Sequence, residues 1–94
     1  MSQLTLPTQT TAISTLGFNA KRLRMQNGMT QQCLAEALLG LPGNEGKTAS
    51  SLRVQIATIE NGRAPTGSAM NWLDWFAAAF DVSFHELLSE PTDD

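Results

Sequence analysis

The chain has 94 residues, of which 41% are hydrophobic, and a formal net charge of −3 at pH 7. Such a chain can form one compact domain but not two, and it contains neither an apolar run near the ~20 residues of a membrane span nor a signal peptide, so we expect a cytoplasmic protein. A single cysteine, Cys33, and a single histidine, His85, exclude an intramolecular disulfide and a Cys/His zinc cage within one chain, and neither a metal nor a cofactor is implied.

Periodicity and turn residues divide the chain into an N-terminal arm, a helical domain and a short tail. Residues 1–11 are rich in Thr and Gln and contain a proline, so we expect a flexible arm, with a short strand at residues 4–6 as the alternative. Residues 12–89 form the predicted domain, and the acidic residues 90–94 form a frayed tail. Within the domain, the sequence predicts helices at about residues 13–27, 29–39, 51–61 and 68–80 and from residue 83 onward.

The helices over residues 29–39 and 51–61 are short and amphipathic. Their predicted buried residues are Leu34, Ala35, Leu38, Leu52, Ile56 and Ile59. The opposite side of the second helix carries Arg53, Val54, Ala57 and Thr58, which are short side chains apart from one arginine and fit a groove. Two short helices packed at an angle form a helix-turn-helix unit.

The connection between these helices, residues 40–50 (GLPGNEGKTAS), reads as a loop. A phosphate-binding P-loop would need a glycine at position 41, where the chain has leucine, and a strand before it, so we reject nucleotide binding. Lys47 and Thr48 could reach a DNA phosphate. The alternative, which we favour, is an inert excursion that is mobile and dispensable for folding, because exposed loops tolerate extra length at low entropic cost.

The helix over residues 68–80 has an apolar arc that exceeds half its circumference. Its inner stripe is predicted to contain Ala69, Leu73, Phe76 and Phe80. Trp72 and Trp75 broaden this stripe, and Phe84 and His85 follow on the next helix, so we expect these four residues to form a dimer interface. The alternative for the tryptophans is a stacking platform for single-stranded nucleic acid, which the acidic surroundings disfavour.

The last helix begins with a capping box formed by Ser83 and Glu86, and Phe84, Leu87 and Leu88 can pack back on the preceding helix. Ser83 and His85 lie too close together in sequence to converge on one reacting centre as catalytic groups do. The sequence therefore indicates no enzyme.

Four segments together resemble one known family, the Cro-like and lambda-repressor-like helix-turn-helix regulators. These segments are LRMQNGMTQ (23–31), LAEAL (34–38), QIATIENGRAP (55–65) and FDVSFHELL (80–88). The resemblance extends over about residues 16–88 and implies a compact, all-α, five-helix domain. The chain departs from the family in the turn between helices two and three, which is usually about four residues and here comprises roughly eleven, residues 40–50.

The resemblance also implies roles for individual residues. Arg24 and Glu60 would form a structural ion pair between helix one and the end of helix three. The implied base contacts are Arg53, Val54, Gln55 and Thr58. The implied phosphate contacts are Thr30, Gln31, Asn61 and Arg63, to which the basic residues Arg22 and Lys47 are added. The long turn leaves the register open by one residue, so that Leu52 is either a core residue or a base contact, and Ser51 either a cap or a phosphate donor.

The charges are segregated along the chain. Residues 1–63 contain all six basic residues and three acids, while residues 64–94 contain six acids and no base. A basic face could therefore meet phosphate while an acidic half points away. We expect a dimeric, sequence-specific repressor of its own or a neighbouring operon. The alternatives are an antitoxin that binds a toxin protein and regulates its own operon, and a protein-interaction module that does not bind DNA.

Overall fold

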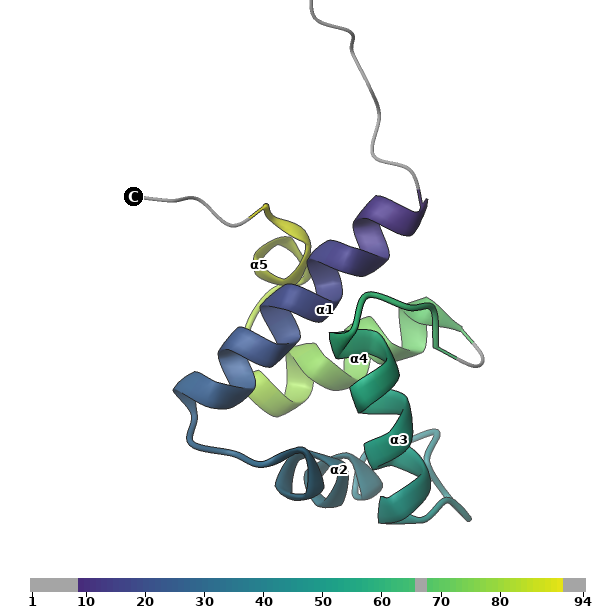
Figure 1. The fold of residues 1–94 in the computed structure, drawn as a ribbon. Helices are drawn as coiled ribbons and strands as arrows, with labels where there is room; N and C mark the ends of the chain where they lie inside the picture. The colour runs from purple at the N-terminus through teal and green to yellow at the C-terminus, as the bar shows by residue number, and fades with distance from the viewer. Residues whose placement is uncertain (1–8, 66–67, 91–94) are drawn as a thin grey trace, which may run out of the picture.

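The computed structural model describes residues 9–65 and 68–90, with side chains from Ala12 onward, and these residues form five helices and no strand (Figure 1). The helices are α1 (Gln9–Gln26), α2 (Gln31–Leu39), α3 (Ala49–Glu60), α4 (Ala69–Phe80) and α5 (Phe84–Leu88). The expected all-α class and the number of helices are confirmed. None of the helices in this part of the chain is long and apolar enough to cross a lipid bilayer.

Local hydrogen bonds explain where the helices begin. The hydroxyl of Thr30 accepts a hydrogen bond from the amide of Cys33, and the hydroxyl of Ser83 accepts one from the amide of Glu86, as the capping patterns predict. Helix α1 already begins at Gln9, so the expected arm over residues 1–11 is wrong for its last residues. Residues 1–8 of the arm, and residues 91–94 of the tail, lie outside the described part of the chain.

One core joins the five helices. It contains most of the predicted inner residues, among them Leu16, Leu34, Ile56 and Phe76, which are at most 2% exposed, whereas Ala69, predicted on the inner stripe of α4, is half-buried and lies outside it. Helix α5 contributes only Leu87 to this core, whereas Phe84 and Leu88 are exposed, contrary to the expectation that all three pack inward. A five-residue helix can turn only one side toward its neighbours.

A buried polar residue attaches α5 to α1. The side-chain amide of Asn19 donates hydrogen bonds to the carbonyl oxygens of Leu87, at 2.7 Å, and Ser89, at 2.8 Å. Leu87 lies in the last turn of α5 and Ser89 is the residue that caps its end, where no further turn of helix satisfies these carbonyls. Asn19 is only 1% exposed and so replaces water as the partner of these groups.

Helices α1 and α3 cross at a glycine. A Cβ atom on Gly17 would overlap the carbonyl oxygen of Ile59 in the last turn of α3. The backbones can approach this closely only because Gly17 has no side chain. This crossing fixes the end of α3 against the middle of α1.

The connection between α2 and α3 packs against the domain, which corrects the prediction of a mobile, inert excursion. The carbonyl oxygen of Pro42 accepts a hydrogen bond of 3.0 Å from the indole of Trp75, and the Lys47 amine lies 4.6 Å from the centre of that ring. Asn44 is 1% exposed and donates a hydrogen bond of 2.8 Å to the carbonyl oxygen of Leu38. The loop therefore caps the end of α2 and covers one edge of α4.

The same loop changes the role of the two tryptophans. Trp72 is 3% exposed and Trp75 is 6% exposed, and their rings contact each other edge to face. Neither ring is available as a dimer anchor or as a stacking platform, so the prediction of a tryptophan interface is wrong. The wide apolar arc of α4 is explained by burial on two sides, under the core helices and under residues 41–47.

The packed loop leads to a stability prediction. Asn44→Ala should lower the free energy of unfolding by about 1 kcal/mol, because the carbonyl of Leu38 loses its buried side-chain donor and keeps only backbone N–H donors such as that of Leu41. Asn71→Ala, at an exposed position of α4, is the matched control and should stay within about 0.5 kcal/mol of the parent chain. Urea unfolding measures both. Equal stability of the two variants would contradict the packing of the loop and would favour the prediction of a mobile loop.

Candidate nucleic-acid interface

Helix α3 has one side in the core and one side open to solvent. Thr48 caps its start by accepting a hydrogen bond from the amide of Ser51 at 3.1 Å, and Leu52 is 1% exposed. The helix therefore begins earlier than predicted, Leu52 is a core residue, and Ser51 does not provide the cap. Nothing in the described part of the chain lies in front of the solvent side (Figure 1).

The predicted base contacts lie on different parts of the open side. Val54 is 52% exposed and lies near the centre of this side. Arg53 is exposed and two turns away from Glu60, so that both lie on the flank of α3 that faces α1 and α2. Gln55 lies on the opposite flank and is half-buried. The hydroxyl of Thr58 donates a hydrogen bond of 3.0 Å to the carbonyl oxygen of Val54.

Ser50 was not among the predicted contacts. It is exposed and lies one turn before Val54 on the same ridge, which continues to Asn61. The earlier start of α3 brings Ser50 into the first turn of the helix. The signal that could have revealed it is Thr48, an N-cap residue directly before the helix-compatible sequence ASS.

An ion pair connects three helices behind this face. The Arg24 guanidinium bonds both oxygens of the Glu60 carboxylate, with Nε–Oε2 at 2.8 Å and the second nitrogen at 3.0 Å from Oε1. It also donates to the carbonyl oxygen of Met29, and Gln31 donates to Oε1 of Glu60 at 3.0 Å. The hydrogen bonds that Arg24 donates to the Glu60 carboxylate raise the pKa of Arg24 above its ordinary value. The ion pair implied by the resemblance is present, and it fixes α1, the start of α2 and the end of α3.

Four of the predicted phosphate contacts lie at helix ends beside α3. Thr30 and Gln31 begin α2, and Asn61 and Arg63 follow the end of α3, where both are exposed. The Gln31 amide bonds Glu60 with one of its two N–H groups, which leaves the other for a further acceptor. The start of α2 and the end of α3 therefore carry polar or basic groups.

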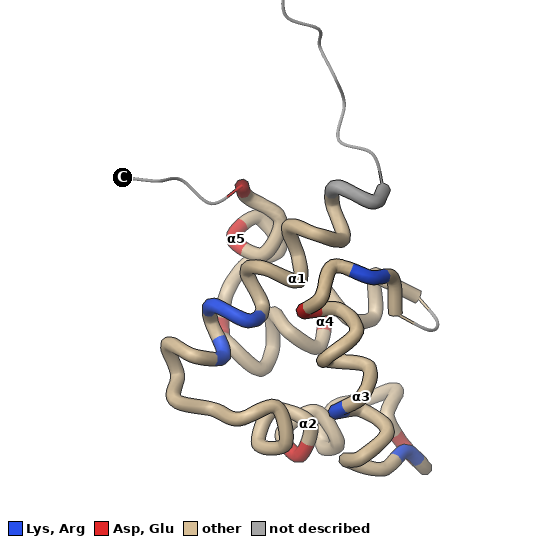
Figure 2. Tube along the Cα trace, viewed as in Figure 1, with Lys and Arg blue, Asp and Glu red and all other residues tan. Residues whose placement is uncertain are grey.

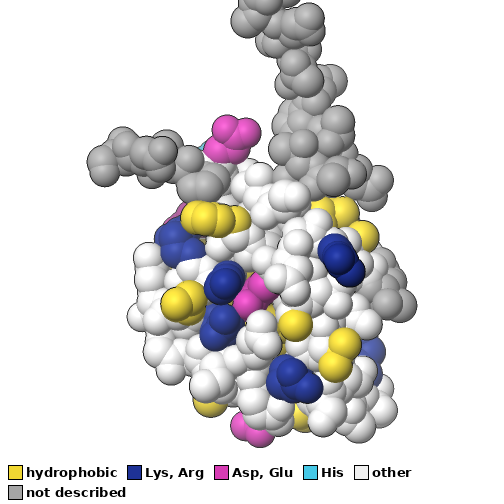
Figure 3. Space-filling view, in the orientation of Figure 1, with side chains coloured by type: hydrophobic (Ala, Val, Ile, Leu, Met, Phe, Trp, Pro, Cys, Tyr) yellow, Lys and Arg dark blue, Asp and Glu magenta, His cyan; other side chains and the backbone are white. Residues whose placement is uncertain are grey.

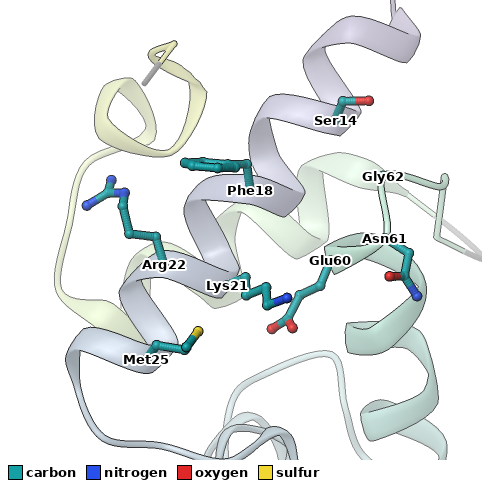
Figure 4. A pocket seen from close by; sticks show the side chains of 8 residues that line it. All are labelled: Ser14, Phe18, Lys21, Arg22, Met25, Glu60, Asn61 and Gly62. Atoms are coloured by element: carbon teal, nitrogen blue, oxygen red, sulfur yellow. The ribbon is translucent and has the colours of Figure 1, made fainter. Parts of the chain in front are cut away.

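The structure does not bring Arg22 and Lys47 to the same face. Arg22 extends toward α5 (Figure 4), and its guanidinium lies 3.5 Å from the side-chain oxygen of Asn19. Lys47 lies over the ring of Trp75, on the side of α3 that carries Ser51 and Gln55. Loop packing and the geometry of α1 thus direct Arg22 and Lys47 to different sides of the molecule, and their contact with phosphate stays a prediction.

Basic residues concentrate on one side of the molecule. Five of the six lie on α1, on α3 and on the segment after α3, and the sixth, Lys47, lies in the loop between α2 and α3 (Figure 2). Acidic residues lie on α4 and α5, but also on α2, in the same loop and at the end of α3. The space-filling view shows the basic side chains spread over the face formed by α1 and α3 (Figure 3). Glu60 is the acid at the centre of this face, and its charge is compensated by Arg24.

The remaining candidate groups have structural roles or stay exposed. The Ser83 hydroxyl caps α5, and His85 is exposed. Hydrogen bonding by Thr30 lowers the pKa of the exposed Cys33 thiol. Among residues 9–65 and 68–90, no three His, Cys, Asp or Glu side chains are grouped so that they could hold a metal ion.

No protein-family model, curated protein sequence or solved structure matches the chain.

Proposed function

We propose that the chain is a sequence-specific DNA-binding regulator of the Cro-like and lambda-repressor-like type, in which α2 and α3 form the helix-turn-helix unit. The observation that carries this proposal is the open side of α3, which combines Arg53 with short side chains while the opposite side is buried. The major groove of B-DNA, ~12 Å wide, admits one such helix. Basic residues on the same side of the molecule add support, since they match the charge of phosphate.

In this proposal the N-terminal half of α3 enters the groove first. Arg53 donates two hydrogen bonds to O6 and N7 of a guanine, and Ser50 and Val54 face the neighbouring bases. The hydroxyl of Thr58 is bonded to its own helix, so its methyl group is the part that meets a thymine methyl. Asn61, Arg63 and the amides at the start of α2 hold the phosphates and set the register without reading sequence.

A dimer completes the proposal. Few basic residues face the DNA from one chain, so one domain binds weakly and two domains on adjacent half-sites bind well. Because the tryptophans are buried, the remaining candidates for the contact between copies are Phe84 and His85 on α5, which are both exposed. As a dimer on an inverted repeat, the protein would repress its own or a neighbouring operon.

Substitutions of Arg53 and Arg63 should change DNA binding in different ways. Arg53→Ala should cost about 1–3 kcal/mol on the preferred duplex and relax preference at one position per half-site, because it removes a base contact. Arg63→Ala should weaken all duplexes alike and reduce the salt dependence by about one unit per chain, because it removes a phosphate contact. Titrations at several salt concentrations measure both effects.

The preferred duplex is obtained by selecting a random pool of double-stranded DNA with the parent chain. A scrambled duplex of the same composition is the control ligand, and Glu36→Ala, on the exposed side of α2, is the control variant. If Arg53→Ala loses the same affinity on the selected and scrambled duplexes, α3 is not the reading helix. If the pool yields no enriched sequence, the protein is not a sequence-specific binder.

A further inference from the structure

A groove runs along the exposed side of α1 and is closed on one side by the end of α3 (Figure 4). The α1 side consists of Ser14, Phe18, Lys21 and Met25, which repeat at intervals of three and four residues and so form one stripe. Phe18 is 52% exposed and Met25 is 61% exposed, although both are large apolar side chains. Large exposed apolar residues on one stripe, rimmed by polar groups, are typical of a binding surface.

The groove is basic. Lys21 and Arg22 line it, and neither forms an ion pair with another residue in the described part of the chain. The single acid in its wall, Glu60, accepts hydrogen bonds from Arg24 and Gln31, so its charge is compensated from behind. Apolar and basic side chains alternate across this part of the surface (Figure 3). A ligand that complements this groove must therefore carry both apolar and acidic groups.

We propose that this groove binds an acidic amphipathic helix of a partner protein. Phe18 and Met25 are two turns apart, about 10 Å along α1, which is the spacing of residues i and i+7 on a partner helix. Glutamate or aspartate beside those anchors would face Lys21 and Arg22. Duplex DNA matches the charge of the groove but offers no apolar ridge for Phe18 and Met25. The inference does not depend on the proposed DNA-binding function, because its anchors Phe18 and Met25 lie on α1 and not on the open ridge of α3. The two surfaces meet at Asn61, which lines the groove at the end of α3.

The test uses a synthetic helical peptide with leucine at positions i, i+4 and i+7 and glutamate at the flanking positions. Titrated into the isotopically labelled full chain, it should shift the amide NMR signals of residues 14–25 and 60–62 and saturate. A peptide with lysine in place of glutamate, and one with serine in place of leucine, should bind at least about tenfold more weakly, because each removes one of the two matching features. Equal binding of the lysine peptide would overturn the proposal, since adhesion would then be unspecific.

Variants of the chain locate the binding site. Phe18→Ser and Met25→Ser should each lower the affinity of the chain for the acidic peptide by about tenfold. Met70→Ser, which alters an equally exposed apolar residue on α4, should leave its affinity unchanged. The double variant Lys21→Glu, Arg22→Glu should prefer the lysine peptide. Because Phe18 and Met25 are both exposed, their variants should have the melting temperature of the parent chain. If Phe18→Ser proves unstable, the peptide affinity of Met25→Ser decides the test.

Two further measurements separate the other possible occupants. If sedimentation shows that Phe18→Ser dissociates a dimer, the groove is an interface between copies of this chain, and the proposal is wrong. If Phe18→Ser lowers the affinity for duplex DNA as strongly as the affinity for the peptide, the groove belongs to a nucleic-acid surface, and the proposal is again wrong. Unchanged association and unchanged DNA binding, with loss of the peptide, support it.

Discussion

Gly17→Ala should destabilise the protein by about 3 kcal/mol or more, the upper range for overpacking, because the new methyl group has no space to enter. It would overlap the carbonyl oxygen of Ile59, which belongs to the backbone of α3 and cannot turn away as a side chain can. Helix propensity predicts the opposite sign, since alanine in a helix is better than glycine by about 1 kcal/mol. The direction of the change alone therefore distinguishes a close crossing of α1 and α3 from an ordinary helical position.

Gly40→Ala is the matched control. Gly40 has a right-handed backbone conformation, with φ of −80°, and a Cβ atom there would lie 3.8 Å from its nearest neighbour, the carbonyl oxygen of Ala37. This variant should be neutral or slightly more stable than the parent chain. For a domain of this size, each kcal/mol changes the melting temperature by about 4–8 °C, so the two variants should be clearly separated in a thermal melt. A Gly17→Ala chain as stable as Gly40→Ala would show that the two helices are further apart.

Glu60→Ala should lower the free energy of unfolding by about 3 kcal/mol, because it leaves the Arg24 guanidinium without its partner in a site largely closed to water. The Glu60 side chain is 3% exposed and that of Arg24 is 12% exposed, so solvent can replace little of the lost interaction. Gln31 loses its acceptor in the same change. Arg24→Ala should be at least as damaging, since the carbonyl oxygen of Met29 then also loses a donor.

Two comparisons separate the buried pair from a surface contact. Glu36→Ala removes an exposed contact with Gln32 on α2 and should cost less than about 0.5 kcal/mol. The double variant Arg24→Ala, Glu60→Ala should be more stable than the sum of the single losses predicts, because it leaves no unpaired charge. Denaturant unfolding of the parent chain, the two single variants and the double variant gives the coupling free energy between Arg24 and Glu60. If neither single variant changes the melt, the pair contributes nothing to stability.

Local sequence patterns are enough to predict the helices and several of their ends. Apolar residues at helical spacing identified the buried sides of α2, α3 and α4, because periodicity depends on the geometry of one helix alone. Thr30 and Ser83 were predictable as caps, and Gly28 and Gly62 as stops, where the structure has φ of 68° and 83°. These features depend on neighbours within a few residues, which a linear sequence displays directly.

Tertiary structure alone decided which surfaces stay open. The apolar arc of α4 indicated that Trp72 and Trp75 needed cover, but not that residues 41–47 of the same chain provide it. Gly17 reads as an ordinary weak position of α1 until α3 crosses it. Phe18 and Met25 read as solvent-side residues until the end of α3 makes one wall of their groove. In each case the deciding contact joins segments far apart in sequence, and the distance between such segments depends on how all the helices pack together.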